Sequence, residues 1–237
     1  MKKAVPRLKK ATDMNRKALF LIIAAFYACA SLAHAVDAVD LRKKARELRD
    51  KKALVRITAI RELGQVHTEQ SIELLVKHMA EEKDPAVRTQ LLDVLALQES
   101  PSSLAAIIAA LDDPNPSVRQ QAVTLLRSYA DNEAISRAVA RRLEKEENES
   151  VKMTALDTLG AHRNKAATEE LGTAVNREKN PAYRKAAIKG LGRHRSTESR
   201  NELDKIERNP ALAKEAKEAL GIQDAPAAAP KKKGKKQ

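Results

Sequence analysis

Residues 115–127 read NPSVRQQAVTLLR, and the same pattern returns through most of the chain. Segments at 53–64 (ALVRITAIRELG), 85–96 (PAVRTQLLDVLA), 149–160 (ESVKMTALDTLG), 181–192 (PAYRKAAIKGLG) and 210–221 (PALAKEAKEALG) align with 116–127 without gaps. Their starts recur about every 32 residues, a period typical of proteins built from helical repeats. The repetition therefore decides the fold.

Each segment predicts one helix. Asp or Asn followed by Pro, as at Asn115–Pro116, is typical of an N-cap and the first helical residue. Apolar residues then follow at helical spacing, as at Val151, Ala155 and Leu159. A glycine near the end of the segment predicts a left-handed residue that closes the helix. These closing glycines are Gly64, Gly160, Gly192 and Gly221.

A second apolar stripe follows each of the first five segments, as at Leu104, Ile107 and Leu111. A helix pair of about 32 residues cannot bury its apolar faces alone, so successive pairs must stack. Aromatic residues make up only 2% of the chain, which disfavours a β-sandwich or a barrel. The expected fold class is all-α.

The pattern D/N-P-x-V-R-x-x-A-x-x-x-L-G resembles the HEAT repeat, in the short form seen in phycobilisome-lyase-type proteins. The resemblance implies a right-handed α-solenoid of about five helix pairs, with capping helices at both ends. The expected boundaries are a cap at 36–52, repeats at 53–84, 85–115, 116–148, 149–180 and 181–209, a half-repeat at 210–221, and a disordered tail at 222–237.

Residues 1–35 are typical of an export signal. A basic start precedes an apolar run from Ala18 to Ala33, and Ala33-His34-Ala35 suits signal peptidase. We expect cleavage between Ala35 and Val36 and a periplasmic or secreted protein, with Met14 as an alternative start. An uncleaved signal anchor is the other interpretation. The single cysteine, Cys29, lies within this segment.

The two ends also carry most of the net positive charge. The formal net charge is +13; residues 1–35 hold seven Lys and Arg against one acid, and residues 225–237 hold five Lys. The part between them is nearly neutral, which argues against a nucleic-acid partner. The tail is expected to solubilise the chain or to tether it weakly to an anionic membrane or cell wall. Its lysines are Lys231, Lys232, Lys233, Lys235 and Lys236.

Three recurring polar features have structural interpretations. A cation at the fourth position of most segments is expected to serve packing and hydrogen bonding; these residues are Arg56, Arg88, Arg119, Lys152 and Arg184. His162 and His194 are expected to be loop residues, too far apart to share a metal ion. Paired acids are expected to be solvated. These pairs are Glu81/Glu82, Asp112/Asp113, Glu146/Glu147 and Glu169/Glu170.

No catalytic constellation is apparent. Some relatives of the repeat family, such as deoxyhypusine hydroxylase, bind two irons through His-Glu pairs, and this sequence has no His-Glu dipeptide. The lyases that attach bilins share the scaffold, but no chemistry-bearing motif carries over. We therefore expect no catalytic residue, metal or cofactor, with a lyase-type protein or an enzyme accessory subunit as the alternative function.

Two surface features suggest a partner site. Ala105 and Ala109 predict a smooth strip on one second helix, and Arg137, Arg141 and Arg142 are spaced to share a face of the next. In the family that the repeats resemble, second helices line the concave side. We expect an exported scaffold that binds another protein there. The alternative is an anionic-surface binder that uses the lysine tail.

Overall fold

The computed structural model describes residues 41–224. The signal segment 1–35 with its predicted cleavage site at Ala35–Val36, the start of the capping helix, and the tail lysines from Lys231 to Lys236 lie outside the described residues. The chain divides at Val66 into two compact units, of which residues 41–66 and 67–224 are described.

The N-terminal unit contains a helical stretch at 41–47 and α2 (Ala53–Gly64). Lys44 forms ion pairs with Glu47 and with Glu62, and so joins the stretch to α2. Leu48, just after this stretch, is buried. The guanidinium of Arg56 donates to the carbonyl of Asp50 at 2.9 Å, which fixes the loop before α2.

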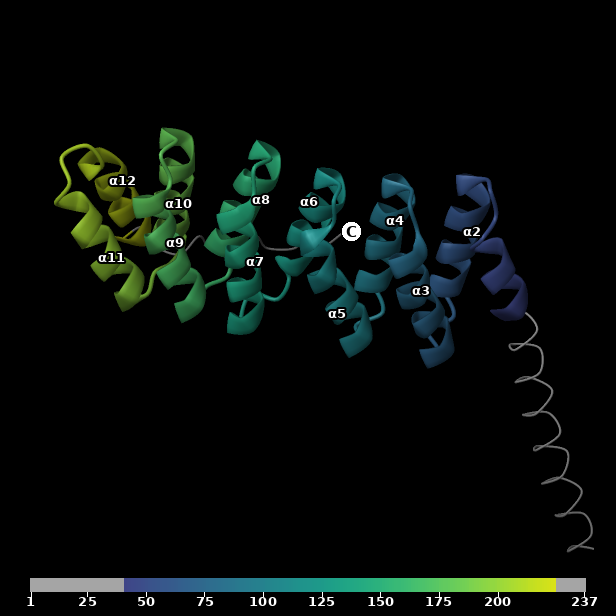
Figure 1. Ribbon diagram of the computed structural model, residues 1–237. Helices are drawn as coiled ribbons and strands as arrows, with labels where there is room; N and C mark the ends of the chain where they lie inside the picture. Colours follow the sequence, from purple (N-terminus) through teal and green to yellow (C-terminus); the bar gives the residue numbers. More distant parts are fainter. Residues whose placement is uncertain (1–40, 225–237) are drawn as a thin grey trace, which may run out of the picture. The chain divides into compact units, whose positions relative to one another are not determined.

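The second unit is a succession of helix pairs in two rows (Figure 1). α4, α6, α8, α10 and α12 pack on one another in that order, while α3 packs on α5, α7 on α9, and α9 on α11. No strand occurs between residues 41 and 224, so the expected all-α solenoid is confirmed. None of the helices described there is long and apolar enough to cross a membrane. The elements are α3 (Glu69–Glu81), α4 (Pro85–Ala96), α5 (Pro101–Ala109), η1 (Ala110–Asp112), α6 (Pro116–Leu126), α7 (Glu133–Lys145), α8 (Glu149–Ala161), α9 (Lys165–Arg177), α10 (Pro181–His194), α11 (Thr197–Glu207) and α12 (Ala213–Asp224).

The predicted N-caps are confirmed at α4, α6, α8 and α10. The side chains of Asp84, Asn115 and Asn180 each accept a hydrogen bond at 2.9 Å from the backbone N–H two residues later. Asn148 does the same at 3.1 Å. Each cap satisfies an N–H group that the first helical turn leaves without a partner. The predicted apolar stripe is equally clear, because Val151, Ala155 and Leu159 are fully buried.

The expected role of the closing glycines is wrong. No described glycine has a positive φ, and α8 and α10 continue beyond Gly160 and Gly192. A Cβ on Gly160 would lie 2.9 Å from the Cα of Gly190, and one on Gly192 would lie 2.9 Å from the carbonyl oxygen of Ala219. These glycines therefore let neighbouring helices of the first row approach closely.

The C-terminal half-repeat begins later than its sequence pattern predicts. Asn209 accepts a hydrogen bond from the N–H of Ala211 at 3.1 Å, but this cap closes a turn, and α12 begins only at Ala213. The helix then passes through Gly221 to Asp224, into the segment assigned to the tail. Ala216 and Ala219 are buried, so α12 covers the apolar end of the row.

Candidate interaction surface

Arginine–carboxylate pairs join the first helix of a repeat to the loop that leads from its second helix into the next repeat. Arg88 donates from Nε and Nη2 to the two carboxylate oxygens of Asp113, both at 2.8 Å. Its Nη1 donates to the carbonyl of Lys83 at 2.8 Å in the loop before its own helix. Arg119 repeats the arrangement with Glu146, at 2.8 and 2.7 Å. The expected structural role of these arginines is confirmed, since two-point pairs of this kind fix geometry as well as charge.

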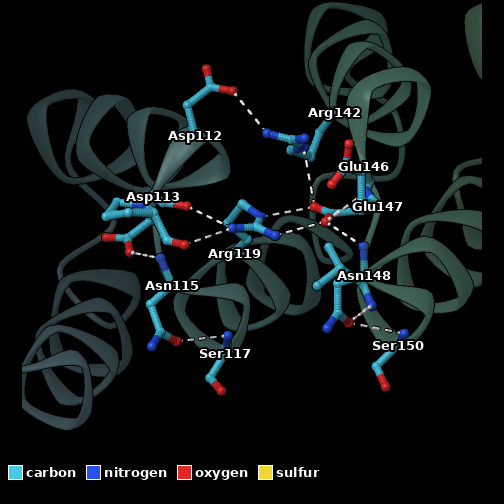
Figure 2. Close-up of polar contacts among 12 residues, drawn as sticks. Asp112, Asp113, Asn115, Ser117, Arg119, Arg142, Glu146, Glu147, Asn148 and Ser150 are labelled. Carbon is cyan, nitrogen blue, oxygen red and sulfur yellow. Dashed lines mark hydrogen bonds and ion pairs between the residues drawn. The ribbon is translucent and has the colours of Figure 1, made fainter.

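Glu146 is the centre of the most connected pair (Figure 2). Its side chain is 1% exposed, and it also lies 3.2 Å from Nε of Arg142, which in turn reaches Asp112. Burial by itself would raise the pKa of Glu146. The hydrogen bonds from Arg119 and from the backbone N–H of Asn148, with the charges of Arg119 and Arg142, outweigh burial and lower that pKa to about 2. The carboxylate is therefore held ionised inside the stack.

The pairs weaken toward the C-terminus. Lys152 lies 3.7 Å from Glu178, and the buried Nε of Arg184 has no hydrogen-bond partner among the described residues. Glu207 lies instead 3.7 Å from Lys217 of α12.

The expectation of solvated acid pairs is wrong for three members. The side chains of Glu82, Asp113 and Glu146 are only 4%, 7% and 1% exposed. A signal existed in the sequence. Each of these acids stands two residues before an N-cap, and the backbone N–H groups of that cap bind the carboxylate, as Asn115 does to Asp113 at 2.8 Å.

His162 and His194 are buried rather than exposed loop residues. Nε2 of His162 lies 3.0 Å from the carbonyl of Leu126 at the end of α6, and Nδ1 lies 3.0 Å from the hydroxyl of Ser136 on α7. His194 makes the equivalent contacts one repeat later, to the carbonyl of Leu159 and the hydroxyl of Thr168. Each ring therefore bridges the two preceding helices. The buried hydroxyl partners were not anticipated from the sequence.

The exposed face of the second helices bears the predicted alanines. On α5, Ala105 and Ala109 are exposed, while Ser103 and Ile107 on the opposite side are buried. Leu104 and Ile108 are half-buried beside them and pack against the core. No charged side chain occurs along α5.

The three candidate arginines of α7 have different environments. Arg142 belongs to the Glu146 cluster and its side chain is 13% exposed. Arg137 is exposed and forms ion pairs with Glu133 at 3.4 Å and with Glu169 of α9 at 3.9 Å. Arg141 is exposed, and no ion pair or hydrogen bond of its side chain occurs within the described part of the chain. Of these three arginines, Arg137 and Arg141 are exposed and therefore accessible to a partner.

Polar contacts also cross the first row at its exposed surface. The carboxylate of Asp157 on α8 pairs with Arg127 at the end of α6 and with Arg193 on α10, the latter at 2.7 Å. These side chains are 35–50% exposed. Among residues 41–224, no three His, Cys, Asp or Glu side chains gather as a metal-ligand set.

Comparisons with solved structures show the fold. The chain is similar to Mini spindles TOG3 of Drosophila melanogaster, with 15% identity, a TM-score of 0.55, and coverage of 78% of this chain and 96% of that one. A designed armadillo repeat protein in complex with a (KR)4 peptide gives 16% identity, a TM-score of 0.49, and coverage of 78% and 99%. The complex of CpcE and CpcF of phycocyanin lyase from a Nostoc species gives 13% identity, a TM-score of 0.39, and coverage of 78% of this chain and 93% of that one.

Comparisons of the sequence itself identify the family. No protein of curated function matches it significantly. The family model for HEAT repeats matches residues 7–96, 79–143 and 136–221, which together span most of the chain. The period of the helix pairs, the Pro-capped first helices and the recurring arginine agree with that match. The chain belongs to the HEAT repeat family.

Proposed function

We propose that this protein is an exported, non-enzymatic scaffold that binds another protein through the exposed face of its second helices. The observation that carries the proposal is the contrast between two neighbouring arginines. Arg142 forms an ion pair with the buried Glu146. Arg141, the residue before it, is exposed and has no ion pair or hydrogen bond of its side chain among the described residues. Exposed arginines are enriched in protein-binding surfaces, where they often contribute most of the binding energy.

The repeat architecture supports this assignment. Helical repeat proteins use rigid surfaces made of equivalent helices to bind extended or helical segments of partners. Here Arg137 joins α7 to Glu169 of α9, so that adjacent second helices present one surface. On α5, Ala105 and Ala109 place no large side chain in the way of a partner.

Crosslinking capture on the native host tests the proposal. The full chain would be compared with Arg141→Ala, with Ala105→Arg, and with Lys185→Ala on the exposed side of α10 as the matched control. We expect the first two changes to deplete the same captured proteins and the control to retain them, at equal helicity by circular dichroism. Equal capture by all variants would contradict the surface assignment. Loss only on removal of residues 231–237 would place the contact in the lysine tail.

Export is tested on the same material. Mass spectrometry of the bait's N-terminus should find a chain that begins at Val36. A bait that retains Met1 or Met14 and captures cytoplasmic proteins would overturn the proposed location.

A further inference from the structure

Two buried histidines connect the last repeats, and the preceding repeats have no histidine in that position. His162 bridges α8 to α6 and α7, and His194 bridges α10 to α8 and α9, with both ring nitrogens of each within 2.7–3.0 Å of a partner. The equivalent residues earlier in the chain are Val66, Gln98 and Tyr129. Buried histidines at this position of the repeat therefore occur only in the C-terminal half of the described stack.

The partners determine the protonation of both rings. A carbonyl can only accept, so Nε2 of His162 donates to Leu126 and Nε2 of His194 donates to Leu159. In the neutral ring Nδ1 then accepts, and the hydroxyl of Ser136 or Thr168 donates to it. Each hydroxyl has a second acceptor, because Ser136 also lies 3.3 Å from the carbonyl of Asn132 and Thr168 lies 3.1 Å from that of Asn164. A protonated ring could therefore still donate from Nδ1 to the hydroxyl oxygen, because the hydroxyl hydrogen could turn to the second carbonyl.

The cost of protonation comes from burial and from neighbouring cations. His162 is fully buried and His194 is 6% exposed. Burial is the main cause that lowers the pKa of each, and the carbonyl hydrogen bond only partly opposes it. The charged groups that act on the rings add to the effect: Arg127 from α6 on His162, and Arg163 with His162 itself on His194. The groups that face the rings from α7 and α9 are the uncharged hydroxyls.

We propose that the C-terminal repeats form an acid-sensitive segment, in which protonation of His162 and His194 opens the two successive repeat interfaces that these rings bridge. The native rings are neutral, and their depressed pKa values make the native state bind fewer protons than an opened state does. The interfaces are therefore at full strength above about pH 6.5, the ordinary histidine pKa, and weaken as the pH falls below it. Because repeats contact only their neighbours, α8 to α12 can separate from α3 to α7 without global unfolding.

Hydrogen exchange of the full chain tests this inference. Amide exchange would be followed at about pH 7.5 and about pH 5.5 and divided by the intrinsic rates of unstructured peptides at each pH. Each native neutral ring would favour opening by up to about tenfold over this range, and both together by up to about a hundredfold. We expect this excess acceleration in peptides from α8 to α12, and a smaller change in α4 and α6.

Matched variants distinguish the effect of protonating His162 and His194 from the general effect of low pH on the chain. His162→Gln and His194→Gln keep an amide donor for the carbonyl but cannot take up a proton near neutrality, so the combined variant should lose the excess acceleration. His67→Gln removes an exposed histidine of the same unit and should change nothing. Acceleration that persists in the combined variant, or that is absent from the unmodified chain, would overturn the proposal.

A second measurement avoids substitutions that impair folding. Proton NMR of the imidazoles in the unmodified chain should show His162 and His194 titrating below about pH 6.5, the ordinary histidine pKa. Titration of both rings at or above that pH would also refute the inference.

Discussion

Arg119 and Glu146 lie 27 positions apart in the sequence and form a two-point ion pair at 2.7 and 2.8 Å between the start of α6 and the loop that follows α7 in the same repeat. Glu146 simultaneously accepts the backbone N–H of Asn148 at 2.9 Å, which orients the start of α8. A single carboxylate thus links the two helices of one repeat to the start of the first helix of the next repeat. The same geometry recurs at Arg88 and Asp113, so the contact is a property of the repeat.

Replacing Glu146 should be among the most damaging polar changes in the chain. In Glu146→Gln the buried guanidinium of Arg119 loses its counter-charge, and we expect the free energy of unfolding in urea to fall by about 3 kcal/mol. Glu147→Gln is the matched control, because the exposed Glu147 contributes only its backbone N–H to the cluster. That control should stay within about 0.5 kcal/mol of the unmodified chain. Equal effects of both changes would contradict the role assigned to Glu146.

The same carboxylate should shape the acid denaturation curve. The pKa of Glu146 is lowered from the ordinary glutamate value of 4.5 to about 2, so its contribution to stability is complete above about pH 4.5 and is lost as the pH falls through about 2. Stability measured across this range should decline less steeply in Glu146→Gln than in the unmodified chain. Identical slopes would show that Glu146 binds its proton equally in both states.

Asp157 also holds two arginines, but in a different environment. Its side chain and that of Arg127 are 50% and 45% exposed, and Arg193 is 35% exposed. Water already solvates these charges, so Asp157→Asn should cost less than about 1 kcal/mol, and added salt should shrink the difference. Urea titrations at low and high salt would measure both. A cost similar to that of Glu146→Gln would mean that burial is not what separates the two clusters.

The sequence was sufficient for the period, the caps and the apolar stripes. The cap at Asn148 and the buried position of Val151 could be predicted because capping and helical periodicity depend on residues nearby in the chain. The environments of Glu146 and His162 depend on residues about one repeat away, and a run of acids or a histidine after a helix looks the same whether buried or solvated. The glycines were misinterpreted for a related reason: Gly160 suits a helix end and a close helix crossing equally, and only the position of Gly190 decides between them.

Gly160 gives a direct test of that close crossing. In Gly160→Ala the new methyl group would lie 2.9 Å from the Cα of Gly190, so α8 and α10 must separate. We expect a loss of about 1–3 kcal/mol despite the higher helix propensity of alanine. Gly221→Ala is the control, because a Cβ there has no neighbour within 4 Å among the described residues. That change should be neutral or stabilise by up to about 1 kcal/mol. A stabilising Gly160→Ala, measured by thermal and urea unfolding, would refute the packing argument.

Asn164 combines two roles that one substitution can separate. Its Oδ1 caps α9 by accepting the N–H of Ala167 at 2.9 Å, while its Nδ2 donates to the carbonyl of Ala130 and to the hydroxyl of Ser136, both at 2.8 Å. Asn164→Asp preserves the cap but replaces the donor with a second acceptor, which leaves the partners in the preceding repeat unsatisfied. We expect a cost of about 1–3 kcal/mol in urea unfolding.

Asn132→Asp supplies the comparison for that change. Asn132 caps α7 in the same way, with Oδ1 accepting the N–H of Ile135 at 3.2 Å, and its Nδ2 makes no hydrogen bond to another described residue. An Asp at this cap should be neutral or slightly favourable, because a negative charge at a helix N-terminus interacts well with the helix dipole. The difference between the two variants then measures the link between repeats rather than the cap. Equal costs at Asn164 and Asn132 would show that the Nδ2 contacts to Ala130 and Ser136 add nothing to the stacking.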